Sequence, residues 1–220
     1  MKNYKFLFLF LVAISISIVS FAQKGEASFT GTIKYDVTIL SEMDAMTKAQ
    51  MPTELTFTYG ENKVRMDQVS PMAGSTALIY DYTNKKLMIL LDLMGQLYAI
   101  TNDLPDDTES EENVEKPAIK FVDEAKTIAG YKCKKAEISS KDGDVVEVFY
   151  TEEIPTSKGL ANNFDGINGT LMEFTFSESG IEMNYKVKEV KKGKVKAHLF
   201  KVPSDYTTIT AEEFGKMFGQ

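Results

Sequence analysis

The feature that most constrains this chain is a series of short segments in which apolar and polar residues alternate. In the clearest, residues 29–39, aromatic or branched apolar side chains occupy nearly every second position, and Thr, Lys or Asp occupy most of the positions between. This period is typical of a β-strand with one buried face and one solvated face. Similar segments recur with short turn signals between them and no helical crossovers, which predicts antiparallel pairing.

The strongest hairpin signal is Asp142-Gly143, which lies between two segments rich in β-forming residues. Asp-Gly supports the positive φ angles of a two-residue type I′ turn. Such a loop would place Ala136 opposite Phe149 and Ile138 opposite Glu147, with both faces of the hairpin partly covered. A one-residue change in loop length would exchange these pairs.

The remaining alternating segments and helical signals complete the predicted architecture. Further strands are expected over 54–59, 63–67, 76–82, 86–91, 96–101, 171–176, 181–188 and 195–202. Short helices are expected over 41–51 with Ser41 as N-cap, around 160–164, and after a capping box formed by Thr210 and Glu213. The sequence therefore predicts a mainly β fold, an antiparallel curved sheet or half-barrel of about ten strands with two or three short helices.

The first 22 residues have the pattern of a secretory signal peptide. Lys2 and Lys5 precede an apolar segment, 6–19, and small residues lead to a cleavage site near Ala22. The apolar segment is shorter than the roughly 20 residues that a membrane anchor needs. We expect a periplasmic or secreted protein whose residues 23–220 form a single β-rich domain.

The net charge, the distribution of acidic residues and the single cysteine limit the partners and ligands that this chain can be expected to bind. Removing Lys2 and Lys5 leaves 23 basic against 32 acidic residues, which disfavours nucleic acid and anionic lipid as partners. Seven acids crowd residues 102–117, so we expect a disordered loop there; a cation-binding loop is the alternative, although the segment lacks the usual glycine. Cys133 is the only cysteine, and we expect it to be a small buried apolar residue.

The sequence contains little that indicates catalysis. His198 is the only histidine and stands in no recognisable motif, so nucleophilic triads and ordinary zinc sites lack their ligands. Acidic pairs such as Glu152-Glu153 leave open a glycosidase dyad, which would need two carboxyl groups about 5–10 Å apart in a cleft. We expect no enzyme activity and no cofactor or metal.

An abundance of apolar side chains on the predicted strands has two interpretations. They can simply fill the core of a large curved sheet, or they can line an apolar cavity in its concavity, with the methionine-bearing helix 41–51 closing the sheet or acting as a lid. The cavity interpretation assigns ligand contact to Phe57, Met66, Phe174, Phe176 and Met183 on strands, and to Met43 and Met46 on the helix.

Three stretches resemble a known family: 126–133 (KTIAGYKC), 147–155 (EVFYTEEIP) and 202–206 (VPSDY). The chain is similar to an uncharacterised family of secreted bacterial proteins, a domain of unknown function. That family is similar in fold to the LolA/LolB-like lipoprotein carriers, half-barrels that hold acyl chains in an apolar concavity under helical lids. No residue here matches a carrier site, so the resemblance implies a fold and a ligand class only.

These observations together predict a non-catalytic, monomeric periplasmic protein that binds a hydrophobic or lipidated ligand in the concavity of a β-sheet. The alternative is a structural or protein-interaction component of the cell envelope with no small-molecule ligand. It would meet an envelope protein through a sheet edge or through the acidic loop.

Overall fold

The protein is described by a computed structural model that covers residues 29–104, 118–139, 145–155, 166–178 and 180–217. Four predicted features lie outside these residues: the signal peptide 1–22, positions 105–117 of the acidic loop, the Asp142-Gly143 turn and the helical turn at 160–164. Within the described ranges, no helix is long and apolar enough to cross a membrane.

Two groups of strands build the sheet. The first comprises β1 (Gly31–Ile39), β2 (Glu54–Gly60), β3 (Lys63–Ser70), β4 (Gly74–Asp81), β5 (Lys86–Leu93) and β6 (Gln96–Asp103). The second comprises β7 (Ala118–Ile128), β8 (Tyr131–Ser139), β9 (Val145–Thr151), β10 (Thr170–Glu178) and β11 (Ile181–Lys192). The remaining elements are α2 (Ala45–Gln50), the 3-10 helix η2 (Ala197–Phe200), β12 (Thr207–Thr208) and α3 (Ala211–Met217).

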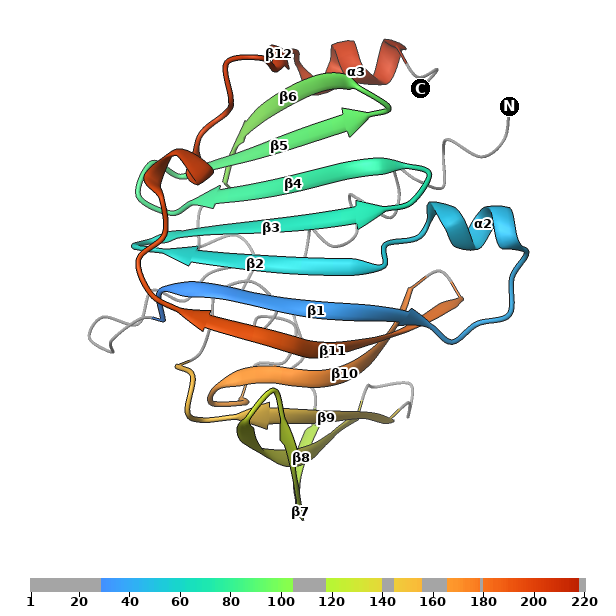
Figure 1. Ribbon diagram of the computed structural model, residues 1–220, viewed down its shortest axis with the longest axis vertical. Coiled ribbons are helices and arrows are strands. Elements are labelled where there is room, and N and C mark those ends of the chain that lie inside the picture. The colour runs from blue at the N-terminus through green and yellow to red at the C-terminus, as the bar shows by residue number, and fades with distance from the viewer. Residues whose placement is uncertain (1–28, 105–117, 140–144, 156–165, 179, 218–220) are drawn as a thin grey trace.

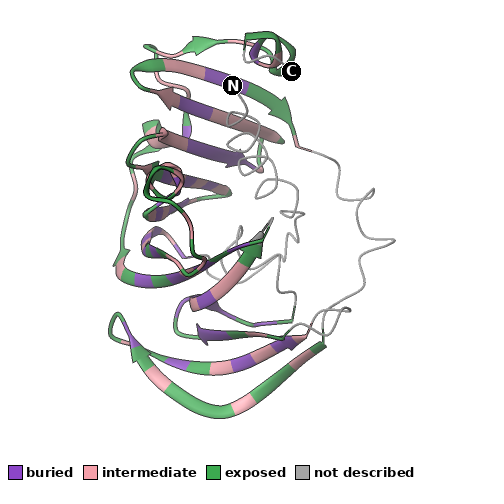
Figure 2. Cartoon of the chain, turned by 90° about the vertical axis from the view of Figure 1, so that its right-hand side faces the viewer, coloured by how far each residue is buried: buried purple, intermediate pink, exposed green. Residues whose placement is uncertain are grey.

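All twelve strands belong to one open sheet in the order β12-β6-β5-β4-β3-β2-β1-β11-β10-β9-β8-β7 (Figure 1). Two antiparallel meanders are joined at its centre, where β1 pairs with β11. The short β12 adds in parallel to β6 and covers that edge. In profile the sheet bends so that both ends turn toward the same side (Figure 2). The predicted mainly β, antiparallel, curved sheet is confirmed, with twelve strands in place of about ten.

One predicted strand is absent, and the strands β7 and β12 were not predicted. The 195–202 strand is instead a loop with η2, because this segment leaves the sheet after β11 and packs Phe200 on the outer face. Strand β7 was missed because it carries charges on both faces, including the adjacent pair Asp123 and Glu124, at a register shift between Val122 and Ala125. An exposed edge strand of this kind shows no alternation.

The predicted pairing within the central hairpin was also wrong. Ala136 pairs with Val148 and Ile138 with Val146, because the last described pair is Ser139 with Val145. Five residues separate that pair, so the register differs by one from that of a two-residue loop, and every partner is exchanged.

The helix after β1 begins three residues later than predicted. Its N-cap is Asp44, whose Oδ1 accepts hydrogen bonds from the backbone N–H groups of Met46 and Thr47, both at 3.0 Å. Ser41 has another role, since its Oγ accepts a 2.8 Å bond from the N–H of Glu182 and ties the segment to β11. Ser41 therefore anchors the loop before the helix, and Asp44 caps the helix in its place.

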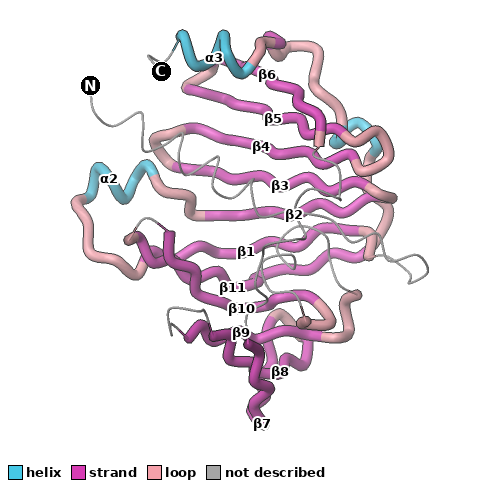
Figure 3. The backbone as a smooth tube through the Cα atoms, turned by 180° about the vertical axis from the view of Figure 1, so that it is seen from behind, coloured by secondary structure: helices cyan, strands magenta, loops and turns pink. Residues whose placement is uncertain are grey.

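The predicted capping box of the last helix is confirmed. The N–H of Thr210 donates to Glu213 Oε2 at 2.7 Å, and the N–H of Glu213 donates to Thr210 Oγ1 at 3.0 Å. Phe214 is buried against Leu91 and Ile100, so α3 lies on one end of the sheet beside β5 and β6. Figure 3, which views the concave side, shows α3 at this end and no other described helix across the middle.

The opposite, convex face has two different coverings. Over β4 to β6, Phe200 of η2 packs on Ala77, Ile79 and Leu90. Arg65 fixes this segment, because its Nη1 donates to the carbonyl of Leu199 at 2.9 Å. Over β7 to β11 the same face carries ion pairs whose side chains are 12% to 58% exposed.

Candidate functional site

The concave face is the candidate site, because one continuous apolar cluster occupies it from β5 to β7. Its members come from alternate positions of neighbouring strands, as the period of two in each strand dictates. The central strands contribute Ile33, Tyr35 and Val37 from β1, Leu55, Phe57 and Tyr59 from β2, and Met183, Tyr185 and Val187 from β11. The outer strands contribute Val64 and Met66, Leu78 and Tyr80, Met172 and Phe174, and Ala136, Ile138 and Val148.

Aromatic rings pack closely at the centre of this face. The ring of Tyr35 meets those of Phe57 and Phe174 edge-on, at centroid distances of 5.9 and 6.2 Å, and Phe174 stacks on Tyr185 at 5.0 Å. The Tyr35 hydroxyl donates to the carbonyl of Leu171 at 2.8 Å. Burial, and then the neighbouring Tyr59, raise the pKa of Tyr35, so it stays neutral.

The structure brings most of the sequence-predicted contact residues to this one face. Phe57, Met66, Phe174 and Met183 are buried in the cluster, and half-buried Phe176 and Met43 pack against it. Met46 is not among them: its side chain is 63% exposed on α2, and no residue of α2 is buried. Because α2 lies beyond the strand ends (Figure 1), it does not cover the face.

Two polar residues of this face were missed by the sequence analysis. Gln68 lies on the same face of β3 as Val64 and Met66, and Tyr80 lies opposite Val64 on β4. The buried Nε2 of Gln68 and the buried hydroxyl of Tyr80 have no hydrogen-bond partner in the part of the chain that the structure describes. Burial first, and then the adjacent Tyr82, raise the pKa of Tyr80. The sequence signal for Gln68 was a glutamine at a position where the alternation of its strand predicts an apolar residue.

The other chemically distinctive side chains, Cys133 and His198, lie on different elements, β8 and η2. Cys133 is buried as predicted, and burial raises the pKa of its thiol. His198 is exposed on η2. Within the described ranges, no group of three or more His, Cys, Asp or Glu residues is placed to hold a metal ion.

The charged residues of the second meander pair with one another on the convex face. Glu173 Oε2 lies 3.0 Å from the Nζ atoms of both Lys126 and Lys186, and Lys126 Nζ also stands 3.5 Å from the ring centroid of Phe149. Burial opposes ionisation of Glu173, yet the two lysines outweigh it and lower its pKa. These ion pairs lie on the convex side of the sheet and leave its apolar, concave side as the candidate binding face.

Most of the chain matches the model of one protein family. Residues 40–206 match the model of DUF4412, described as a domain of unknown function. The chain belongs to the DUF4412 family. This match confirms the family resemblance found in the sequence, and no curated protein matches the chain.

Solved structures resemble this DUF4412 chain only distantly. An uncharacterized conserved protein from Thermus thermophilus is 13% identical with a TM-score of 0.49, over 91% of this chain and 98% of that one. A PNGF-II structure is 15% identical with a TM-score of 0.48 over 86% of this chain, which spans about a third (32%) of the PNGF-II chain. LprF from Mycobacterium bovis is 11% identical with a TM-score of 0.33, over 73% of this chain and 85% of that one.

Proposed function

We propose that this protein is a non-catalytic binder of a hydrophobic or lipidated ligand, which it holds on the concave face of its sheet. The observation that carries the proposal is a continuous apolar face that also holds two buried polar atoms without partners in the described part of the chain, Gln68 Nε2 and Tyr80 Oη. The protein acts as a periplasmic or secreted monomer and needs no cofactor.

The two polar atoms indicate what kind of ligand fits. A buried donor that lacks a partner costs about 1–3 kcal/mol, so such groups normally meet a partner or water. Both the amide N–H of Gln68 and the hydroxyl of Tyr80 can donate. Tyr80 pairs with Val64 and Gln68 pairs with Thr76, so the two groups lie about 13 Å apart along the strands. An elongated molecule with an apolar chain and an acceptor oxygen, such as a carboxylate or an ester, would satisfy one of them while its chain contacts residues such as Phe57 and Met66.

The first test is native mass spectrometry of the protein purified after export, followed by solvent extraction. A bound mass that extracts as a lipid or an acyl chain supports the proposal. A protein that carries no added mass, and that gains none when incubated with a fatty acid or a phospholipid, contradicts it.

A single substitution separates ligand contact from folding. Tyr80→Phe removes a buried hydroxyl that has no partner in the described chain, so we expect the free energy of unfolding to rise by up to about 1 kcal/mol. If the hydroxyl meets the ligand, the same change weakens binding of a fluorescent fatty acid about tenfold. Leu78→Met, a volume-conserving change on the same strand and face, is the matched control and should alter neither measurement greatly.

A second candidate function is supported by one observation. Several large apolar side chains are exposed at one end of the strands, among them Met72 and Met94. An exposed apolar surface together with an inner face that holds no ligand would favour an envelope interaction protein. The absence of extractable ligand would move the assignment to this candidate.

A further inference from the structure

The exposed apolar side chains gather along one rim of the sheet. Eight large hydrophobic residues are exposed in the described part of the chain, and six of them stand where strands end on the side of the β3–β4 and β5–β6 hairpins. We name this the apolar rim, and it comprises Leu40, Met46, Val69, Met72, Met94 and Val145. The remaining two, Phe121 and Met217, lie within β7 and on α3.

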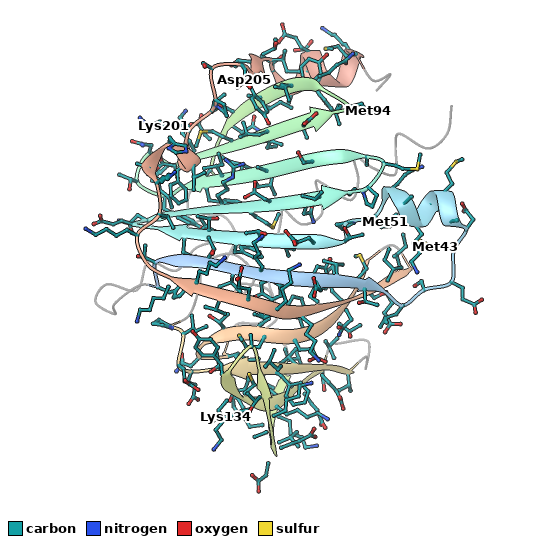
Figure 4. The ribbon with its side chains drawn as sticks, viewed as in Figure 1. Met43, Met51, Met94, Lys134, Lys201 and Asp205 are labelled. Atoms are coloured by element: carbon teal, nitrogen blue, oxygen red, sulfur yellow. The ribbon has the colours of Figure 1, made fainter. Side chains whose placement is uncertain are left out.

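The strand register places these residues on the same side. Ser75 at the start of β4 pairs with Asp92 near the end of β5, so the two hairpin turns are neighbours. The N–H of Met72 donates to the carbonyl of Ala49 at 2.9 Å, which joins α2 to the β3–β4 turn. Figure 4 shows Met43 and Met94 at this side of the molecule.

The opposite rim has turns of the same kind with polar residues. We name it the polar rim, and its exposed turn residues include Glu61, Asn62, Asn84, Lys85 and Lys194. None of the eight large hydrophobic residues exposed among the described residues lies there. The two rims therefore differ in chemistry although both consist mostly of tight hairpin turns.

Met94 is the most informative member of the apolar rim. It is 89% exposed and has a φ of +56°, in a two-residue turn with Gly95 at +90°. Asn, Asp or Gly usually occupies this first position of such a turn. On the polar rim the equivalent turn, Ala129–Gly130, has φ values of +48° and +87° and carries the small residue alanine, and Asn62 has a φ of +53° in another turn. Methionine is unfavourable at position 94 both for its backbone conformation and for its exposed apolar surface, which indicates a contact beyond the chain itself.

We propose that the apolar rim docks onto the surface of an electrically neutral lipid bilayer. Met72 and Met94 project from two separate turns and Met46 from α2, so the rim presents separate apolar tips, which a fluid lipid phase accommodates without matching pockets. Unbranched methionine adapts to such irregular surroundings.

The charges near the rim select the kind of lipid. Exposed Glu42, Asp44 and Glu182 outnumber Lys48 near α2, and α3, which packs against Leu93 next to Met94, adds two glutamates and one lysine. Anionic headgroups would be repelled by this acidic surface, whereas zwitterionic headgroups would not. The proposal does not depend on whether the concave face holds a ligand.

Flotation with phosphatidylcholine vesicles tests the proposal. The full chain is expressed, including residues 1–22, and the exported protein is used. A mass measurement first identifies its N-terminal residue. We expect the protein to float with the vesicles, and M46Q/M72Q/M94Q to reduce the partition coefficient about tenfold or more. Phe121→Gln, which removes an equally exposed apolar side chain away from the rim, is the matched control and should partition like the parent.

Three results would overturn the proposal. These are failure of the parent protein to float, equal partitioning of the triple variant, or an equal loss in the Phe121→Gln control. If the triple variant does not fold, Met94→Asn serves instead, because it relieves the turn while removing one apolar tip. A parent that forms a dimer which the triple variant abolishes, without floating, would assign the rim to a second copy of the chain. Tyr80→Phe should float like the parent protein, so the flotation experiment and the fatty-acid-binding experiment can fail independently of each other.

Discussion

The two rims of the sheet have similar architecture and opposite chemistry. At the polar rim, Asn62 and Lys85 occupy left-handed turn positions and face solvent, whereas at the apolar rim Met94 occupies such a position with an equally exposed side chain. Turn geometry alone would favour polar residues at both rims. We infer that the apolar rim meets a requirement other than folding, which substitutions at the two rims can test.

The largest effect is expected at a glycine of the apolar rim. Gly74 has a φ of +90°, and a Cβ there would lie 2.0 Å from the carbonyl oxygen of Asp92. Gly74→Ala should therefore lower the free energy of unfolding by roughly 3 kcal/mol in urea titration, combining left-handed strain with a backbone clash. Gly95 has the same φ and open space around it, so Gly95→Ala should cost only about 1–2 kcal/mol. Equal losses would show that the close approach at Gly74 is not a constraint.

The next effect compares the aspartates that hold one turn on each rim. At the polar rim, buried Asp81 accepts bonds from the Asn84 N–H at 3.0 Å and side-chain amide at 2.8 Å, and pairs with Lys63. At the apolar rim, Asp92 accepts one 2.8 Å bond from the Gly95 N–H. Asp81→Ala should cost about 2 kcal/mol and Asp92→Ala about 1 kcal/mol or less in the same titration. A reversed order would contradict the assigned contacts.

Acid should weaken the polar-rim turn through the same carboxyl. Burial opposes ionisation of Asp81, but Lys63 and Asn84 outweigh it and lower its folded pKa. A lowered folded pKa contributes stability that is fully present above the unfolded value, about 3.9, and is lost as the pH falls through the folded value. The parent should therefore lose more stability than Asp81→Ala when urea titrations at pH 5 and pH 3 are compared. Equal losses in the two proteins would contradict this linkage.

The smallest effect exchanges the turn residues of the two rims. Met94→Asn should raise the free energy of unfolding by about 0.5–1 kcal/mol, and Asn62→Met should lower it by a similar amount, because Asn tolerates the left-handed region better. Thermal unfolding of both variants, compared with the parent protein, measures the two changes in stability. A stabilising Asn62→Met would show that the Met94 turn carries no conformational cost.

Much of the fold followed from the period of the side chains. Alternation, β-forming residues and turn signals together located ten of the twelve strands, and the Thr210–Glu213 spacing located α3. Strand β7 escaped because an edge strand solvated on both faces has no period to detect. The register of the central hairpin depended on a loop length that the sequence does not determine.

The candidate site was only partly predictable for a related reason. Phe57 and Met183 stand on alternating faces of recognisable strands, so their assignment to one face followed from strand periodicity. Tyr80 and Gln68 required knowledge of which buried polar atoms have partners, which depends on the full packing. The apolar rim emerged only when the hairpin register placed Met94 beside Met72, since the two residues are distant in sequence.

A single tryptophan at each rim would report lipid contact directly, because the chain contains no tryptophan of its own. Met94→Trp and Lys85→Trp place the reporter at left-handed backbone positions of similar φ, +56° in a two-residue turn and +50° at the end of the 82–85 turn. On addition of phosphatidylcholine vesicles, we predict a blue shift and increased fluorescence for Met94→Trp and no change for Lys85→Trp. No shift at Met94, or the same shift at both rims, would contradict the claim that one rim of this sheet meets a lipid surface.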